Sequence, residues 1–269
     1  MTITNEQHEV IHEVRANFDA IFTWDYSRSR PALIKLYEKA KTSQWNGETD
    51  LPWDTVVDLE QVVANAPRSP EEDPVLLAAQ QPGQPLANWS QKEWDQLLIE
   101  MQNWTLSQFM HGEQGALVCT AKIVETVPWI DAKYYASTQV MDEARHVEVF
   151  AKYLDTKLTG HYPINAHLRM LLDDIINDSR WDMTYLGMQI MVEGLALAAF
   201  AAPHLATELG DPERAARAAE WLARVVLTYV AHPVPGVDLA DPVAARHLLS
   251  TYVLPALVAV PSAPTKEHS

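Results

Sequence analysis

The sequence predicts an all-α protein organised around two long, successive helices. The chain of 269 residues is 48% hydrophobic and contains only nine glycines, which favours a globular, mostly helical protein. No proline occurs between residues 90 and 127, and neither glycine nor proline occurs between 129 and 159. Because proline breaks the interior of a helix, these stretches predict two helices of roughly 30 to 35 residues on either side of Pro128.

Residues 1–89 are predicted to form a helical extension with a proline-rich segment that wraps the bundle. Apolar side chains four residues apart before residue 23 favour a peripheral helix. Pro31 predicts the start of a short helix that ends near Ser43. Prolines at positions 67, 70, 74, 82 and 85 predict an extended, irregular connection from about residue 64 to residue 88.

Local signals mark the elements that follow. Ser90 and Glu93 form a capping box, in which each side chain bonds to the backbone of the other residue, so the first long helix is predicted to begin there. After the second long helix, a one-sided apolar pattern predicts a helix over 164–177. The mostly apolar run from 183 to 202 predicts another helix, one that is largely buried.

Two Asp-Pro pairs predict the last helices. Asp211 precedes Pro212, and Asp241 precedes Pro242, which combines a favoured N-cap residue with proline in the first turn. The helical bundle is therefore predicted to span residues 90–260, and residues 261–269 form a polar tail.

One pair of side chains in the second long helix has the spacing of metal ligands. Glu143 and His146 are three residues apart, so on a helix both project from one face. A carboxylate and an imidazole together suit iron, manganese or zinc. Charged groups on an apolar face need a metal or an ion-pair partner, and we favour the metal. The apolar neighbours on that face are Val140, Ala144, Val147 and Ala151.

The Glu-x-x-His spacing by itself is a weak signal. From composition alone it arises by chance in roughly one chain of this length in three or four, and Glu9 and His12 repeat it in a polar segment. We interpret that copy as coincidental, because no carboxylate-bearing helix precedes it. Arg145 and Glu148, which are neighbours of Glu143 and His146, also allow the alternative of a solvated helix face.

Two further carboxylates are predicted to come from neighbouring helices. Glu113 lies on an apolar face of the first long helix, where Gly112 and Gly115 would permit close helix packing or a local distortion. Glu193 is the only formal charge between residues 183 and 202. An unpaired carboxylate in such surroundings is strongly disfavoured, so we expect Glu193 to be protonated, ion-paired or bound to a metal.

Charge and cysteine content restrict the classes of function. The formal net charge of −16 argues against nucleic-acid binding, because phosphate recognition requires clustered lysine and arginine. It also disfavours an anionic membrane surface. The single cysteine, Cys119, excludes intramolecular disulfides and fits a reducing compartment. With no secretion-signal pattern and no run of about 18 apolar residues, the sequence predicts a cytoplasmic protein without a membrane partner.

The order of these residues resembles the ferritin-like di-iron carboxylate superfamily. Glu113 is followed thirty residues later by Glu143 and His146, and then by Glu193 in an apolar helix. The segments Gly-Glu113 and Met-Asp-Glu143-Ala-Arg-His146 are most similar to bacterial multicomponent monooxygenase hydroxylases, ribonucleotide reductase small subunits and amine N-oxygenases. The resemblance covers about residues 90–230.

The resemblance implies a fold, a chemistry and a set of partners. The fold would be a ferritin-like four-helix bundle with extra N-terminal and C-terminal helices, assembled as a homodimer. The cofactor would be two irons, or manganese and iron. The protein would activate dioxygen to oxidise or hydroxylate a small organic substrate, with an electron-donor protein as its partner.

The resemblance also assigns ligands, with one departure from the family pattern. Glu113, Glu143 and His146 would hold the first metal, and Glu193 would serve the second. The family has a second Glu-x-x-His on the helix after Glu193. Here His232 stands in that region, but Tyr229 occupies the position of the glutamate and Pro233 ends the helix. His232 is therefore the remaining candidate ligand, and its partner stays open.

Three hypotheses follow for the function. The first is an oxidoreductase with a two-metal centre. The second is a protein with a single metal ion, or a non-catalytic scaffold or partner subunit that keeps the bundle. The third is a helical interaction protein in which the carboxylates pair with arginines such as Arg145, Arg180 or Arg224.

Overall fold

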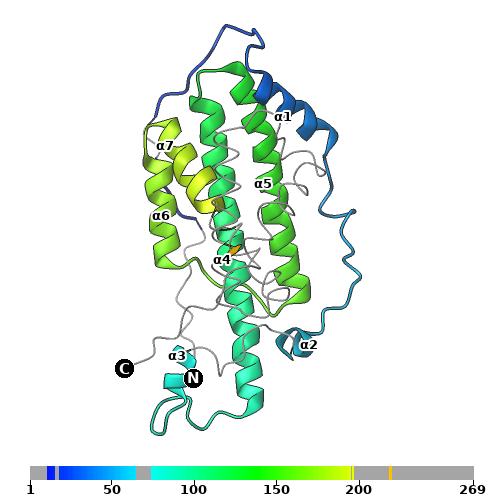
Figure 1. Cartoon of the computed structure of the whole chain (residues 1–269), viewed down its shortest axis with the longest axis vertical. Helices are drawn as coiled ribbons and strands as arrows, with labels where there is room; N and C mark the ends of the chain where they lie inside the picture. The colour runs from blue at the N-terminus through cyan, green and yellow to red at the C-terminus, as the bar shows by residue number, and fades with distance from the viewer. Residues whose placement is uncertain (1–10, 16–17, 65–73, 195, 197–217, 220–269) are drawn as a thin grey trace, which may run out of the picture. The chain divides into compact units, whose positions relative to one another are not determined.

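The computed structural model describes residues 11–15, 18–64, 74–194, 196, 218 and 219, and all regular elements in these ranges are helices. The predicted all-α class is confirmed for this part of the chain, in which no strand occurs. The chain divides into two compact units, Met1–Gln189 and Ile190–Ser269. The elements are α1 (Pro31–Thr42), α2 (Leu59–Ala64), α3 (Pro74–Ala79), α4 (Gln91–Thr126), α5 (Ile130–Lys157), α6 (Ala166–Asn177), α7 (Trp181–Tyr185) and the π-helix η2 (Leu186–Val192) (Figure 1).

Helices α4 and α5 form the antiparallel pair around which the first unit is built (Figure 1). They contain 36 and 28 residues, and the turn at Pro128 joins them as the sequence predicts. At the start of α4, the Glu93 carboxylate accepts hydrogen bonds from the backbone N–H of Ser90 at 2.7 Å and from its hydroxyl at 2.8 Å. Local sequence signals therefore account for the start of α4 and for the turn between the two helices.

Helices α6 and α7 pack against α4 on the side away from α5 (Figure 1). A Cβ atom on Gly115 would lie 2.5 Å from Cδ2 of Leu172 in α6, so the glycine permits the close approach that the sequence predicts. A Cβ atom on Gly112 would meet nothing within 4 Å. The distortion considered for this part of α4 is absent, since the helix is continuous from Gln91 to Thr126.

A buried lysine of α4 binds the backbone carbonyls at the C-terminal end of α6. Lys122 of α4 is 3% exposed. Its Nζ atom donates to the backbone carbonyls of Ile175 at 3.3 Å, Ile176 at 2.9 Å and Asp178. The last carbonyls of a helix have no intrahelical partner and carry partial negative charge, so this ammonium group satisfies them and ties α4 to α6.

The distortion instead occurs in the apolar run after α6. The predicted helix over 183–202 begins at Trp181 in α7 and becomes the π-helix η2 from Leu186 to Val192. Gln189 of η2 joins the two long helices: its Nε2 donates to Oγ1 of Thr120 at 3.2 Å, and its Oε1 accepts from Nε2 of Gln139 at 3.1 Å. A π-turn inside a helix frequently marks a functional site.

The N-terminal segment differs from the prediction. Residues 11–15 and 18–30 are not helical, so the expectation of a peripheral helix is wrong in the described part of this stretch. Asp131, in the first turn of α5, holds the chain extended because its carboxylate accepts from Nε of Arg28 at 2.5 Å and from the backbone N–H groups of Ser29 and Arg30 at 3.0 Å. The helix predicted from Pro31 is confirmed as α1.

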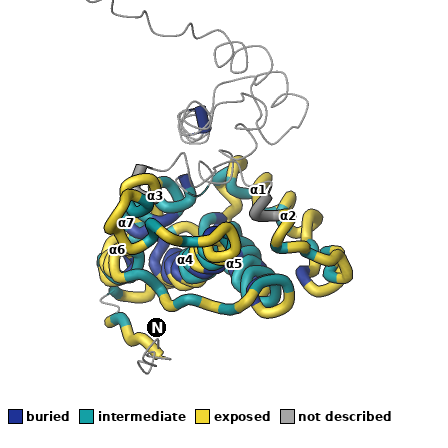
Figure 2. Tube along the Cα trace, turned by 90° about the horizontal axis from the view of Figure 1, so that it is seen from below, coloured by how far each residue is buried: buried dark blue, intermediate teal, exposed yellow. Residues whose placement is uncertain are grey.

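The described part of the proline-rich connection contains a short helix that the sequence did not predict. Residues 74–79 form α3, a short helix with Pro74 at its first position, where the missing N–H group costs nothing. Figure 2 shows that buried residues gather along α4 and at its contacts with neighbouring helices. The predicted helices that begin at Asp211 and Asp241 lie outside the described residues.

Candidate metal centre

Two carboxylates and one imidazole meet between α4 and α5. Nδ1 of His146 lies 3.1 Å from Oε2 of Glu113 and 3.1 Å from Oε2 of Glu143. Glu113 comes from the middle of α4, and the other two come from one face of α5. The antiparallel pairing of the helices therefore unites the Glu-x-x-His pair with the third predicted ligand.

The cluster is closed on the carboxylate side and open on the imidazole side. Glu143 is buried, with 7% of the residue exposed. The side chain of Glu113 is 14% exposed, whereas that of His146 is 42% exposed. Small molecules can therefore approach the cluster past His146, while the helices shield both carboxylates from bulk water.

The contacts within the cluster shift the pKa values of His146 and Glu143. The hydrogen bonds to Glu113 and Glu143 raise the pKa of His146 to about 10. Burial raises the pKa of Glu143, and the nearby Glu113 carboxylate raises it further, although the bond from His146 opposes the shift. At neutral pH the metal-free cluster therefore contains His146 as an imidazolium ion beside the two carboxyl groups.

The arrangement fits a divalent metal ion. One ligand atom from each of the three residues can be chosen so that all lie within 4.8 Å of one another. Two atoms bound at about 2.1 Å to a common ion, at right angles, lie about 3.0 Å apart, close to the 3.1 Å contacts of Nδ1 with the two carboxylates. Within the described ranges, this is the one group of three or more potential ligands that converges in this way.

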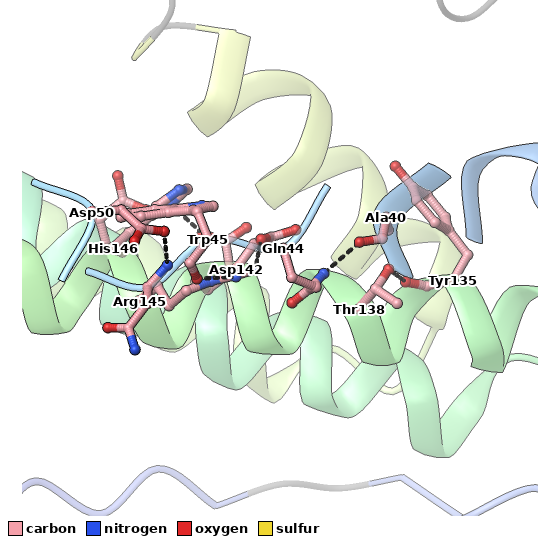
Figure 3. A network of polar contacts seen from close by, with 12 residues as sticks. Ala40, Gln44, Trp45, Asp50, Tyr135, Thr138, Asp142, Arg145 and His146 are labelled. Carbon is pink, nitrogen blue, oxygen red and sulfur yellow. Dashed lines mark hydrogen bonds and ion pairs between the residues drawn. The ribbon is translucent and has the colours of Figure 1, made fainter. Parts of the chain in front are cut away.

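Arg145 does not lie on a solvated face, as its neighbourhood in the sequence had suggested. The residue is 4% exposed. Its guanidinium donates to the backbone carbonyl of Trp45 at 2.7 Å and to the Asp142 carboxylate. Figure 3 shows these contacts on the side of α5 that faces the segment after α1. The Trp45 segment covers Arg145, which is why a charge on α5 is buried.

The hypothesis that Glu113 and Glu143 pair with arginines is not supported for Arg145 or Arg180. Arg145 is engaged by Asp142, and Arg180 pairs with Asp178 at 2.8 Å. Arg224 lies outside the described residues. The partner of Glu113 and Glu143 in the described cluster is His146, so these carboxylates do not depend on Arg145 or Arg180.

Trp45 is a neighbour of the cluster that the sequence did not identify. Its ring centroid lies 6.4 Å from that of His146, and the guanidinium of Arg145 lies 5.3 Å from the same indole. A Cβ atom on Gly47 would lie 2.7 Å from Cγ2 of Val149, so this glycine lets the segment dock on α5. No local sequence motif predicts this contact, because it joins residues about 100 positions apart that only the fold brings together.

The geometry of this cluster does not test the two remaining predicted ligands, Glu193 and His232. Glu193 follows η2 and belongs to the second unit, which begins at Ile190. His232 lies outside the described residues. Their ligand roles stay predictions. His12, from the second Glu-x-x-His, contacts Asp173 of α6 at 2.9 Å, and its Glu9 is not among the described residues.

Two further observations bear on the predicted classes. None of the described helices has the length and apolar character that crossing a membrane requires. Cys119 is a free, fully buried thiol, and burial raises its pKa to about 12. It is therefore a small core residue rather than a nucleophile.

No protein-family model matches the chain, and no curated protein or solved structure is significantly similar to it. The resemblance to ferritin-like di-iron proteins therefore rests on the sequence motifs and remains a prediction. The geometry of Glu113, Glu143 and His146 is an observation independent of that resemblance.

Proposed function

We propose that the protein is a metal-dependent oxidoreductase that activates dioxygen at a carboxylate-bound and imidazole-bound iron or manganese centre and oxidises a small organic substrate. The convergence of Glu113, Glu143 and His146 at 3.1 Å is the observation that carries the proposal. The ferritin-like bundle, the homodimer and the electron-donor partner are parts of the proposal that come from the sequence resemblance.

Charge balance supports a metal ion over a purely structural ion pair. With both carboxyl groups ionised, the metal-free cluster would hold two negative charges against one imidazolium, and burial together with the nearby Glu113 raises the pKa of Glu143 against that state. The single N–H group at Nδ1 must also serve two acceptors. A divalent cation with a neutral imidazole would cancel both carboxylate charges and give every ligand atom a partner.

Each residue would contribute a distinct property. Glu113 and Glu143 would supply negative oxygen ligands, and His146 would supply a neutral nitrogen ligand after losing its Nδ1 proton. Bound iron would supply Lewis acidity and electrons for dioxygen chemistry. The helices would keep bulk water from the carboxylates, and the exposed edge of His146 would leave a path for small molecules.

A second candidate is a single-metal or non-catalytic relative that retains the helical scaffold. The specific observation in its favour is that the cluster gathers three ligands, which is sufficient for one metal with open coordination positions. A two-metal centre would need Glu193, His232 and further ligands. The two candidates therefore differ in metal stoichiometry.

The first test is metal content per chain by mass spectrometry after anaerobic loading with ferrous iron. We expect the wild type to retain iron, Glu143→Gln to lose it, and the matched variant Glu148→Gln to retain it, because Glu148 is exposed on the same helix. Two irons per chain support the two-metal centre, and one supports the single-metal candidate. Absence of bound iron in the wild type would reject both metal proposals.

The second test separates an oxidoreductase from a metal-binding scaffold. Ferrous-loaded wild-type protein is mixed with air-saturated buffer, and dissolved oxygen is followed with an electrode. We expect oxygen uptake in excess of free ferrous iron at the same concentration, and none above background with zinc. Metal binding without faster oxygen uptake would support the metal-binding scaffold and exclude the proposed activity.

A further inference from the structure

A chain of three polar side chains crosses from α4 to α5 near the candidate metal centre. Nε2 of Gln189 in η2 donates to Oγ1 of Thr120 in α4 at 3.2 Å, and Oε1 of Gln189 accepts from Nε2 of Gln139 in α5 at 3.1 Å. Thr120 is fully buried, and all three residues belong to the first compact unit. The Gln189 amide is therefore a bridge between the two helices that carry the candidate metal ligands.

The bridge lies in register with these ligands. Thr120 comes seven residues after Glu113, and Gln139 comes seven residues before His146. Seven residues make almost two turns of an α-helix, so each polar residue shares a helix face with the ligand of its own helix. Because α4 and α5 are antiparallel (Figure 1), equal steps in opposite directions keep the two pairs opposite each other. The bridge and the cluster thus lie on one α4–α5 interface, about 10 Å apart along the helix axes.

A second observation places the α5 end of the bridge on the face of the ligands. Gln139, Glu143 and His146 all line one depression between α1 and α5, as their spacing of four and seven residues predicts. Gln139 is one helical turn from Glu143. A movement of α5 away from α4 at Gln139 would therefore also move Glu143 and His146 away from Glu113.

Packing against α6 holds the π-helix in place. Oγ1 of Thr184 donates to the backbone carbonyl of Ile175 at 3.4 Å, and a Cβ atom on Gly187 would lie 2.9 Å from Cγ1 of Ile175. Met188 is fully buried. These contacts come directly before Gln189 in the chain, so its side chain extends toward α4 and α5 from a backbone that α6 supports.

A carboxamide can hold two helices at a defined distance. It donates through nitrogen and accepts through oxygen, so the Gln189 side chain serves a hydroxyl on one helix and an N–H group on the other. Both bonds require a narrow range of distances, whereas an apolar side chain of similar length would fill the space without binding either partner. Metal ligands must be held to within about 0.5 Å of their working positions, so the separation of their helices matters.

We infer that Gln189 is a positioning residue, which sets the α4–α5 spacing at the metal centre through Thr120 and Gln139. The inference deepens the proposed function and rests on it for the importance of that spacing to metal binding. The spacing itself requires no metal, so it can be measured in metal-free protein.

The first measurement is the distance between α4 and α5 in metal-free, full-length protein. Gln114→Cys and Glu148→Cys introduce labelling sites at exposed positions of the two helices, next to the cluster. Spin labels are attached there, and pulsed electron paramagnetic resonance gives the distribution of distances between them. Cys119 is fully buried, so the introduced cysteines take the labels.

Gln189→Met keeps the approximate size of the side chain and removes both hydrogen bonds. We expect a longer mean distance and a broader distribution than in the wild type. The matched control is Gln108→Met, which removes an amide of α4 that binds the segment between α5 and α6. The control should leave the α4–α5 distance unchanged, because Gln108 does not join these two helices.

Metal affinity is the second measurement. The zinc dissociation constant, from competition with a chelator, should rise at least about tenfold in Gln189→Met, as when a group that orients metal ligands is lost. The absorption spectrum of the cobalt-loaded protein should also change, because it reports the geometry of the ligands. Gln108→Met should alter neither, although it also removes an amide that joins two segments.

A second variant tests the bridge from its other end. Gln139→Met removes the α5 partner of Gln189, so it should also weaken zinc binding. Its effect and that of Gln189→Met should not add in the double variant, because both remove the same contact. Additive effects would show that the two amides act separately, which would overturn the inference.

The remaining outcomes separate this inference from the proposed function. If the wild type binds no metal but Gln189→Met changes the α4–α5 distance, the proposed function alone is rejected. If the wild type binds metal and Gln189→Met leaves the distance, the zinc affinity and the cobalt spectrum unchanged, this inference alone is rejected. Equal changes in Gln189→Met and Gln108→Met would also overturn it, because they would reflect a general loss of stability.

Discussion

Nδ1 of His146 in α5 lies 3.1 Å from a carboxylate oxygen of Glu113, which is 33 residues earlier on the neighbouring helix. This contact joins the Glu-x-x-His pair to a carboxylate that no local motif connects with it. Both neighbours of this nitrogen are carboxyl oxygens and the pKa of His146 is raised to about 10, so a proton competes with a metal ion for Nδ1. The balance between the proton and the metal can therefore be measured.

Metal affinity should depend strongly on pH. The pKa of His146 in the metal-free protein is raised to about 10 by its hydrogen bonds to Glu113 and Glu143. Because metal must displace this proton, affinity should rise about tenfold for each pH unit up to that value. Zinc dissociation constants at pH 6, 7 and 8 test this, and a plateau above pH 7 would contradict it. In His146→Gln the slope should fall.

Glu143→Gln should stabilise the metal-free protein while abolishing metal binding. Burial raises the pKa of Glu143, so the folded state disfavours its ionised form. For an acid whose folded pKa is raised, the cost begins as pH rises through the unfolded pKa and is complete above the folded pKa. Calorimetric scans at pH 8 should show a Tm higher by a few degrees than wild type, and Glu148→Gln should show little change. A lower Tm for Glu143→Gln would contradict this account.

Gly115→Ala and Gly112→Ala should have opposite effects on stability. The new methyl group at 115 would lie 2.5 Å from Leu172, whereas the one at 112 would meet nothing within 4 Å. Overpacking should cost about 1–3 kcal/mol at 115, and the better helix propensity of alanine should contribute about 0.5–1 kcal/mol at 112. Urea denaturation measures both values. Equal effects would show that α4 and α6 do not approach closely at Gly115.

Lys122→Met should destabilise the fold by about 2 kcal/mol, because it leaves buried carbonyl groups at the end of α6 without a donor. These carbonyls belong to Ile175, Ile176 and Asp178. The exposed Lys92→Met is the matched control and should change the free energy of unfolding by less than about 0.5 kcal/mol. Similar values for the two variants in urea denaturation would mean that the cap contributes nothing measurable.

The sequence by itself determined the two long helices and the pair of candidate ligands that lie near each other along the chain, Glu143 and His146. Proline positions, the Ser90 capping box and the periodicity of apolar residues act within a few residues, so the bounds of α4 and α5 could be predicted closely. The face shared by Glu143 and His146 follows from helix geometry alone. These features require no contact between distant parts of the chain.

Tertiary structure decided the environment of those residues. Arg145 is buried because the segment at Trp45 covers it. Residues 28–30 are extended because Asp131 accepts from the Arg28 side chain and from the backbone N–H groups of Ser29 and Arg30. The π-helix at Gln189 joins Thr120 and Gln139 from two other helices. Periodicity records how polar each position is but not which distant segment packs on it, so helix faces could be predicted and their partners could not.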